Sequence, residues 1–317
     1  MKRSDRRTEA LTAYGFLLPN ILGFLVFTSL PVFASLFFAF TRWDLFHSPK
    51  FVGLENFTSL LGFSRSPDER TSILGLTSVP YAANDPFFWQ YLYNTVYLML
   101  AIPVTMAGSL ALAIALNQKI RGVVVYRTLY FLPSITSGVA VLVLWKWLYN
   151  TDIGLINQLL THLGVAHPPD WLGSSAWAKP SLMLMGFVMG VGGSNMILYL
   201  AALQGVPRDL YEAAQIDGAS SWQQFRTITW PLISPTTFFL TLMSIIGGFQ
   251  GGFMTAYIMT GGGPAGSTTT IEYYIFNKAF TVFNMGYASA IAWFLFVIIL
   301  LLSLATWRFG GKSVNYT

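Results

Sequence analysis

Residues 10–41 read ALTAYGFLLPNILGFLVFTSLPVFASLFFAFT, a stretch without a single Asp, Glu, Lys or Arg. An apolar segment of about 18 residues or more is long enough to cross the hydrocarbon core of a bilayer as a helix. Lipid offers the backbone no hydrogen-bond partner, so such a segment must be helical. The stretch is also much longer than the ~7–15-residue apolar core of a cleaved signal peptide. It therefore predicts a membrane anchor that is retained.

Five further windows lack charged residues: Pro86–Gln118, Thr128–Trp145, Pro180–Pro207, Thr227–Ile271 and Ala279–Trp307. The pattern predicts six membrane-spanning helices, near residues 12–40, 90–117, 128–149, 180–203, 231–258 and 287–308. Segments of about ten residues with alternating polarity, which would indicate membrane strands, are not seen. The predicted fold class is an all-α polytopic membrane protein, with a single transmembrane domain over residues 1–317.

The composition excludes several other classes of protein. Only 10% of the residues are charged, 54% are apolar and the mean hydropathy is +0.56, whereas a soluble domain carries about 25% charged residues. The chain has no Cys, and His47, His162 and His167 lie too far apart to form a His site on one helix, so we expect no metal site. The net charge of +5 is scattered at the ends of apolar runs, which does not favour nucleic-acid binding.

The distribution of Lys and Arg predicts the orientation in the membrane. With the N-terminus inside, the inner segments contain 11 Lys and Arg in about 57 residues, and the outer segments contain 7 in about 111 residues. Because inner loops are enriched in Lys and Arg, both termini are expected on the cytoplasmic side.

Motifs of catalysis and of ion coupling are missing from the sequence. All six spans lack charged residues, which are the usual mark of an ion-coupled pathway. Residues 261–268 read GGGPAGST and resemble a phosphate-binding loop, but Ser267 replaces the lysine that reaches the phosphates. We therefore expect no catalytic residue and no cofactor bound by this chain.

The predicted inner loop at 204–230 reads QGVPRDLYEAAQIDGASSWQQFRTITW. Pro207 suits the start of a helix, Gly218 suits its end, and Ser221 with Gln224 has the spacing of a capping box. Pro231 is expected to end the second helix and to begin the fifth span. The sequence therefore predicts two short helices of about ten residues each, which need a surface to pack on because helices this short are marginal in water.

Two faces of this predicted hairpin carry the residues that could contact another protein. Leu210, Ala213 and Ala214 share one face of the first helix, and Trp222 and Phe225 give the second a large apolar surface. These faces could dock a partner or could seat the hairpin on the chain's own helices. The residues alone leave both interpretations open.

Small and polar residues in spans four and five suggest either close helix packing or the wall of a solute path. Ser244, Gly248 and Gly251 share one helix face, Gln250 is adjacent to it, and Asn195 lies on span four. These five residues are the candidate solute-path residues.

The loop also resembles a family signature. Glu212-Ala213-Ala214, three residues, Gly218, nine residues, Ile228 and Pro231 are similar to the EAA motif of binding-protein-dependent ABC importer permeases. Trp230 departs from the pattern, which usually has Leu there. Further segments resemble the carbohydrate-uptake branch, of the maltose-permease and glycerol-phosphate-permease type: FLLP at 16–19, VGLENF at 52–57, NT at 94–95, FLP at 131–133 and GGP at 262–264. Segment 62–85 is longer than the family leads us to expect.

The resemblance implies a subunit that imports a sugar or sugar-like solute across a prokaryotic plasma membrane. It implies as partners a second homologous permease, two ATPase subunits that bind ATP and Mg²⁺, and an extracytoplasmic solute-binding protein. The residues that would couple ATP hydrolysis to transport are then Glu212, Ala213, Ala214, Asp217, Gly218, Trp222 and Phe225. The alternative is a carrier or channel that works alone, which would have no use for an EAA hairpin.

Overall fold

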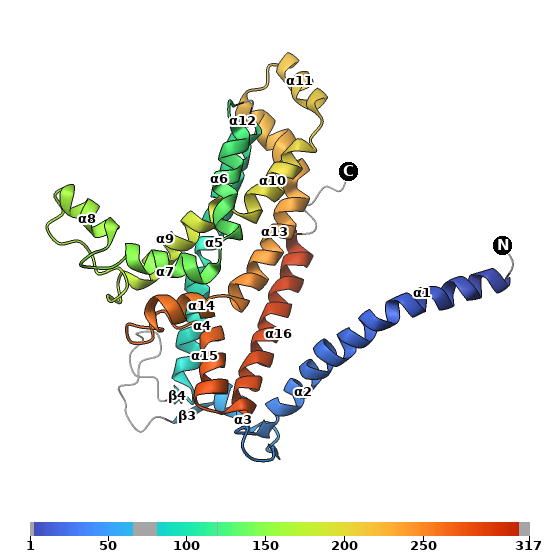
Figure 1. Cartoon of the computed structure of the whole chain (residues 1–317), viewed down its shortest axis with the longest axis vertical. Coiled ribbons are helices and arrows are strands. Elements are labelled where there is room, and N and C mark those ends of the chain that lie inside the picture. Colours follow the sequence, from blue (N-terminus) through green and yellow to red (C-terminus); the bar gives the residue numbers. More distant parts are fainter. Residues whose placement is uncertain (1–2, 66–80, 119, 311–317) are drawn as a thin grey trace. The chain divides into compact units, whose positions relative to one another are not determined.

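The computed structural model describes residues 3–65, 81–118 and 120–310 (Figure 1). Of the long segment 62–85, residues 66–80 lie outside the described residues. The chain divides into two compact units. The first comprises residues 1–85 with 275–294, and the second comprises residues 86–274 with 295–317. That 1–317 forms one transmembrane domain remains a prediction.

The first unit begins with helical segments α1 (Arg3–Phe24), η1 (Leu25–Ser29) and α2 (Leu30–Ala39). It continues with β1 (Thr41–Arg42), β2 (Lys50–Phe51), α3 (Glu55–Leu61), β3 (Phe63–Arg65) and β4 (Tyr81–Ala83). Strand β1 pairs antiparallel with β2, and β3 pairs antiparallel with β4. These two pairs of short strands are the only strands in the described part of the chain, so the fold is mostly helical, as predicted.

The second unit contains the remaining helices up to residue 274. They are α4 (Pro86–Met99), α5 (Ala101–Asn117), α6 (Val123–Ile135), α7 (Gly138–Leu148), α8 (Leu155–His162), α9 (Ala178–Val191), α10 (Ser194–Gln204), α11 (Arg208–Ile216), α12 (Ser221–Gln224), η2 (Phe225–Thr229), α13 (Trp230–Gln250), α14 (Phe253–Thr255) and η3 (Ala256–Thr260). Helices α15 (Ile271–Phe276), η4 (Asn277–Thr281) and α16 (Met285–Gly310) complete the chain, and α15 and α16 each belong to both units.

Helices long and apolar enough to cross a membrane are found at Thr12–Ala39, Pro86–Asn117, Ala178–Gln204, Ser221–Gln250 and Met285–Arg308. A bent pair, Val123–Ile135 with Gly138–Leu148, makes a sixth if it is counted as one span. The predicted class of a polytopic helical membrane protein is confirmed. The expected first, second, fourth and sixth spans agree with the observed helices to within a few residues.

The third span is not the single helix that the sequence predicted at 128–149. Helices α6 and α7 meet at an angle of 97°, and Thr136, which follows α6, has extended backbone. Pro133 lies in the last turn of α6, and the following Ser, Thr and Gly residues are poor helix formers. Proline and such residues are recognised causes of sharp kinks, so charge-free composition alone overestimated the length of this helix.

The fifth span also differs from the predicted helix at 231–258. It begins at Ser221 and ends at Gln250, so Pro231 does not separate the hairpin from the span. The backbone then breaks at Gly251 and Gly252, where Gly252 has φ of +107°. A residue with a Cβ rarely adopts that conformation, and the paired glycines therefore end the helix before residue 258.

Two π-helical segments precede prolines inside the apolar helices. Segment η1 comes just before Pro31, and η2 comes just before Pro231. A proline has no N–H for the carbonyl four residues earlier, and widening the local turn is a common response to an interrupted helical ladder. The helices thus continue through these prolines instead of stopping at them.

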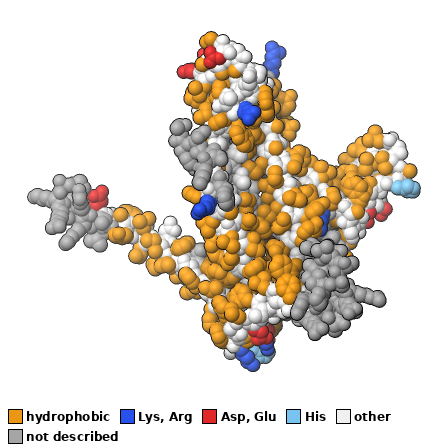
Figure 2. Space-filling view, turned by 180° about the vertical axis from the view of Figure 1, so that it is seen from behind, with side chains coloured by type: hydrophobic (Ala, Val, Ile, Leu, Met, Phe, Trp, Pro, Cys, Tyr) orange, Lys and Arg blue, Asp and Glu red, His pale blue; other side chains and the backbone are white. Residues whose placement is uncertain are grey.

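Apolar side chains are exposed over much of the surface (Figure 2). Phe16 and Phe27 of the first span are 83% and 82% exposed, and no residue of that span's most apolar window is buried. Apolar surface this large is unusual on a soluble monomer but is normal where helices face lipid. The second unit nevertheless has its own core, in which Met106, Ala113, Met196 and Ile233 are buried.

Candidate functional site

Helices α11 and α12 meet at a turn where the sequence predicted a hairpin, but the second helix is not a separate one of about ten residues, because α12 continues through η2 into α13. Helix α11 ends at Ile216, and Gly218 follows with φ of +76°, as its position in the sequence led us to expect. The capping box is formed by Ser220 and Gln223 rather than by Ser221 and Gln224. Ser220 N–H donates to Gln223 Oε1 at 2.7 Å, and Gln223 N–H donates to Ser220 Oγ at 3.4 Å. Ser220 is the N-cap because it is the residue with extended backbone.

One side of the hairpin rests on the chain's own core. The hydroxyls of Tyr211 and Thr229 are hydrogen-bonded at 2.8 Å and join α11 to η2. Phe225 and Ile228 pack against the core cluster that includes Ile233. Tyr211, Phe225 and Ile228 therefore seat the hairpin on the chain's own helices.

The other side of the hairpin remains exposed. Ile216 is 87% exposed, Trp222 is 68% exposed and Leu210 is 43% exposed. Among the predicted coupling residues, Glu212, Ala213, Asp217 and Gly218 are exposed and Ala214 is half-buried. Sequence reasoning did not select Ile216, although it follows Leu210 and Ala213 at intervals of three residues, a spacing that keeps side chains near one face of a helix.

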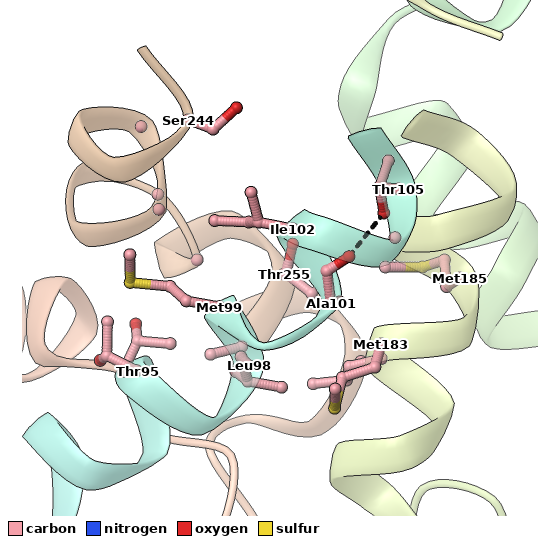
Figure 3. A pocket seen from close by; sticks show the side chains of 18 of the residues that line it. Thr95, Leu98, Met99, Ala101, Ile102, Thr105, Met183, Met185, Ser244 and Thr255 are labelled. Carbon is pink, nitrogen blue, oxygen red and sulfur yellow. Dashed lines mark hydrogen bonds between the residues drawn. The ribbon is translucent and has the colours of Figure 1, made fainter. Parts of the chain in front are cut away.

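A cavity of about 330 Å³ lies between the helices of the second unit (Figure 3). A volume of this size falls within the range of small-molecule pockets. Its walls come from α4, α5, α9, α10, α13, the segment 251–256 and residues Thr268 and Thr270. It is lined by Thr95, Leu98, Met99, Ala101, Ile102, Thr105, Met106, Leu182, Met183, Met185, Gly186, Asn195, Ser244, Gly247, Gly248, Gly251, Gly252, Thr255, Ala256, Thr268 and Thr270.

Four of the five candidate solute-path residues line this cavity, namely Asn195, Ser244, Gly248 and Gly251. Gln250 is not among the lining residues and is exposed. The sequence placed Gln250 inside a continuous helix, but α13 ends at that residue. The structure thus brings four of these residues together around one space, and their functional role stays a prediction.

The lining combines methionine side chains with hydroxyl groups and contains no charged residue. Met99, Met183 and Met185 supply flexible apolar surface (Figure 3). The Thr105 hydroxyl donates to the Ala101 carbonyl at 2.9 Å, so it retains its capacity to accept a further hydrogen bond. Such a cavity can hold an uncharged ligand that has both apolar and hydroxyl-bearing surfaces. Sequence reasoning missed the threonines and methionines of α4, α5 and α9, because their convergence depends on packing between distant segments.

The segment after the Gly251–Gly252 break forms one wall of the cavity. Phe253 N–H donates to Glu272 Oε2 at 2.8 Å, and Lys146 Nζ donates to the Ile258 carbonyl at 2.8 Å. Burial raises the pKa of Glu272, and the hydrogen bond from Phe253 partly offsets that rise. Two charged side chains therefore hold this segment at its two ends.

The glycine-rich loop that resembled a phosphate-binding motif is closed by its own hydrogen bonds. The N–H of Gly262 donates to the Ala256 carbonyl, that of Ser267 donates to the Pro264 carbonyl and that of Thr268 donates to the Gly262 carbonyl. A phosphate-binding loop instead points such N–H groups at the ligand. The three donors are already engaged, which does not favour phosphate binding.

Relatives of the chain match nearly its whole length. Residues 21–309 match the family described as "Binding-protein-dependent transport system inner membrane component". The probable ABC transporter permease protein YesP of Bacillus subtilis (strain 168) is 36% identical and is aligned over 100% of this chain and 96% of that protein. The lactose transport system permease protein LacF of Rhizobium radiobacter is 39% identical over 69% of this chain and 75% of that protein.

The fold is also that of a solved transporter. Two crystal structures of a bacterial alginate ABC transporter contain a chain with 23% sequence identity to this one. The TM-scores are 0.79 and 0.77, with coverage of 98% of this chain and 99% of that chain in the first and 96% of both chains in the second. The second structure is in complex with an alginate pentasaccharide-bound periplasmic protein.

The family match includes the hairpin, the cavity and every apolar span after the first. Of the first span, it includes the part from residue 21 onward. The family match indicates a multi-pass protein of the inner membrane that acts in transport and not as an enzyme. The chain therefore belongs to the family of binding-protein-dependent transport system inner membrane components, the permease subunits of ABC importers.

Proposed function

We propose that this chain is one of two homologous permeases that together form the pore of an importer for a neutral sugar or sugar-like solute. Two separate ATPase subunits bind ATP and Mg²⁺ and power the cycle. An extracytoplasmic binding protein delivers the solute. This chain itself binds no cofactor.

The proposal of a neutral solute rests on the cavity of about 330 Å³, which is lined by hydroxyl and methionine side chains and has no charged lining residue. Burying a charged solute without a partner costs far more free energy than burying hydroxyls that can be hydrogen-bonded. A carboxylate- or phosphate-bearing solute fits these lining residues less well.

The exposed side of the hairpin supports the proposed coupling role. Leu210, Ala213, Ile216 and Trp222 are solvent-exposed apolar residues of a hairpin whose Tyr211, Phe225 and Ile228 pack on the core. Binding of an ATPase subunit to this surface would carry the movement of that subunit to α13, because α12 continues through η2 into α13. The ATPase subunit can drive the pore from one state to the other only if its contacts with the hairpin differ between those two states.

The orientation can be tested by cysteine labelling, since the chain has no Cys of its own. Gln215 on the hairpin and Gln158 on α8 are both exposed and lie on opposite predicted sides of the membrane. We expect Gln215→Cys to react with an impermeant maleimide only in inverted vesicles and Gln158→Cys only in right-side-out vesicles. Labelling with the opposite sidedness would overturn both the orientation and the coupling proposal.

The proposed function is tested by reconstituting the chain with its partner permease, the ATPase subunits and the binding protein in liposomes. We expect ATP-dependent accumulation of a neutral mono-, di- or oligosaccharide from a radiolabelled panel, and none when the ATPase subunits are omitted. Uptake without ATPase subunits would indicate a carrier that works alone. Uptake restricted to uronic acids or sugar phosphates would contradict the neutral solute class.

A further inference from the structure

The short helical segment Phe253–Thr260, composed of α14 and η3, is called the wall segment below because Thr255 and Ala256 line the cavity. It is bounded on both sides by glycines in the left-handed region. Gly252 has φ of +107°, and Gly261 has φ of +63°. Glycine is the residue that adopts such backbone readily, so the wall segment is an independent helical piece between two sharp turns.

The two ends of the wall segment are fixed in different ways. Near its C-terminal end, Met259 is 2% exposed and packs with Leu142 and Trp145 of α7, and Lys146 of the same helix donates to the Ile258 carbonyl. At its N-terminal end, the Phe253 N–H is held by the Glu272 carboxylate of α15. The first N–H groups and the last carbonyls of a helix have no partner within it, and both charges match the helix dipole.

Neither Glu272 nor Lys146 forms an ion pair with another side chain in the described part of the chain. Each of the two charged side chains is instead hydrogen-bonded to a backbone group of the wall segment. A hydrogen bond between a carboxylate and a backbone N–H is among the stronger kinds. The aromatic rings of Phe253, Tyr257 and Tyr273 lie within 5.9 Å of one another beside the same connection.

We propose that Glu272 and Lys146 are positioning residues that clamp the wall segment between α15 and α7 and thereby set the shape of the solute cavity. Glu272 has the larger role, since buried packing also holds the C-terminal end whereas the N-terminal end follows the Gly251–Gly252 break. This inference rests on the proposed function only for its transport readout. It goes beyond that function, because it assigns a role to two side chains that do not line the cavity.

The first test needs no solute and is therefore independent of the proposed function. In the assembled transporter, Thr255→Cys is the only thiol of this chain, and its reaction rate with an impermeant maleimide reports the access to the wall segment. We expect Glu272→Ala to accelerate labelling by on the order of tenfold, as expected for the loss of a hydrogen bond to a charged group, and Glu272→Gln to have a smaller effect. Lys146→Met should accelerate labelling less than Glu272→Ala.

The matched control is Asp152→Ala, which removes an exposed carboxylate with no side-chain hydrogen bond within the described residues. It should leave the labelling rate unchanged. The Glu272→Gln variant keeps a hydrogen-bond acceptor and serves if Glu272→Ala does not reach the membrane. Labelling rates within about twofold of the parent for both Glu272→Ala and Lys146→Met would overturn the proposal.

The second test uses transport. For Glu272→Ala we expect the solute concentration at half-maximal uptake to rise on the order of tenfold, with the maximal rate per assembled transporter nearly unchanged. A purely structural role would instead lower the amount of assembled transporter and leave the half-maximal concentration as it was. That result, together with unchanged labelling, would reject a positioning role even if sugar uptake itself is established.

Discussion

Replacing Gly218 with Val is expected to leave the chain in the membrane while uptake falls at least about tenfold. Gly218 has φ of +76°, and a Cβ added there would meet no atom within 4 Å. The cost therefore lies in the backbone, where the left-handed conformation is unfavourable by about 1–2 kcal/mol for residues with a Cβ and by more for a β-branched one. The turn between α11 and α12 would change, and the exposed hairpin surface would be displaced.

The measurement is solute uptake and ATP hydrolysis in the same proteoliposomes. We expect ATP hydrolysis to continue without uptake, or the ATPase subunits to dissociate during purification. Gly218→Asn is the matched control, because Asn adopts positive φ more readily than other residues with a side chain, and it should retain most of the uptake. Normal uptake by Gly218→Val would show that the hairpin turn is not part of the coupling pathway.

Replacing Asn195 with Leu is expected to weaken solute uptake on the order of tenfold, because a solute hydroxyl left without a partner in a buried site costs about 1–3 kcal/mol. Asn195 lines the cavity, is half-buried and forms no side-chain hydrogen bond among the described residues. Its amide is thus available to a ligand. The quantity to measure is the concentration for half-maximal uptake.

Gln250→Leu is the matched control for this prediction, since it makes a comparable change from an amide to an apolar side chain at an exposed position that does not line the cavity. We expect it to alter uptake by less than about twofold. Of these two candidate residues, Asn195 lines the cavity and Gln250 does not. An effect confined to Gln250→Leu would place the solute path outside the cavity described above.

Short sequence patterns correctly predicted those features of the site that depend only on residues adjacent in the sequence. Gly218 ends α11 with positive φ as expected, and the Ser-Gln spacing predicted a capping box within one residue of its actual place. Charge-free windows located the spans for the same reason, because the cost of burying a charge in lipid applies to each segment separately.

Tertiary structure decided what depends on contacts between distant segments or on small differences in backbone energy. The 97° bend between α6 and α7 and the end of α13 at Gln250 lie within windows that remain apolar throughout. Hydropathy does not distinguish a continuous helix from a broken one of the same composition. The hydrogen bonds of Glu272 to Phe253 and of Lys146 to Ile258 join residues 19 and 112 positions apart. Only the packing of the helices brings such groups together. The sequence by itself therefore determined the class, the approximate places of the spans and the turn at Gly218, and the fold determined the breaks in the third and fifth spans and the cavity.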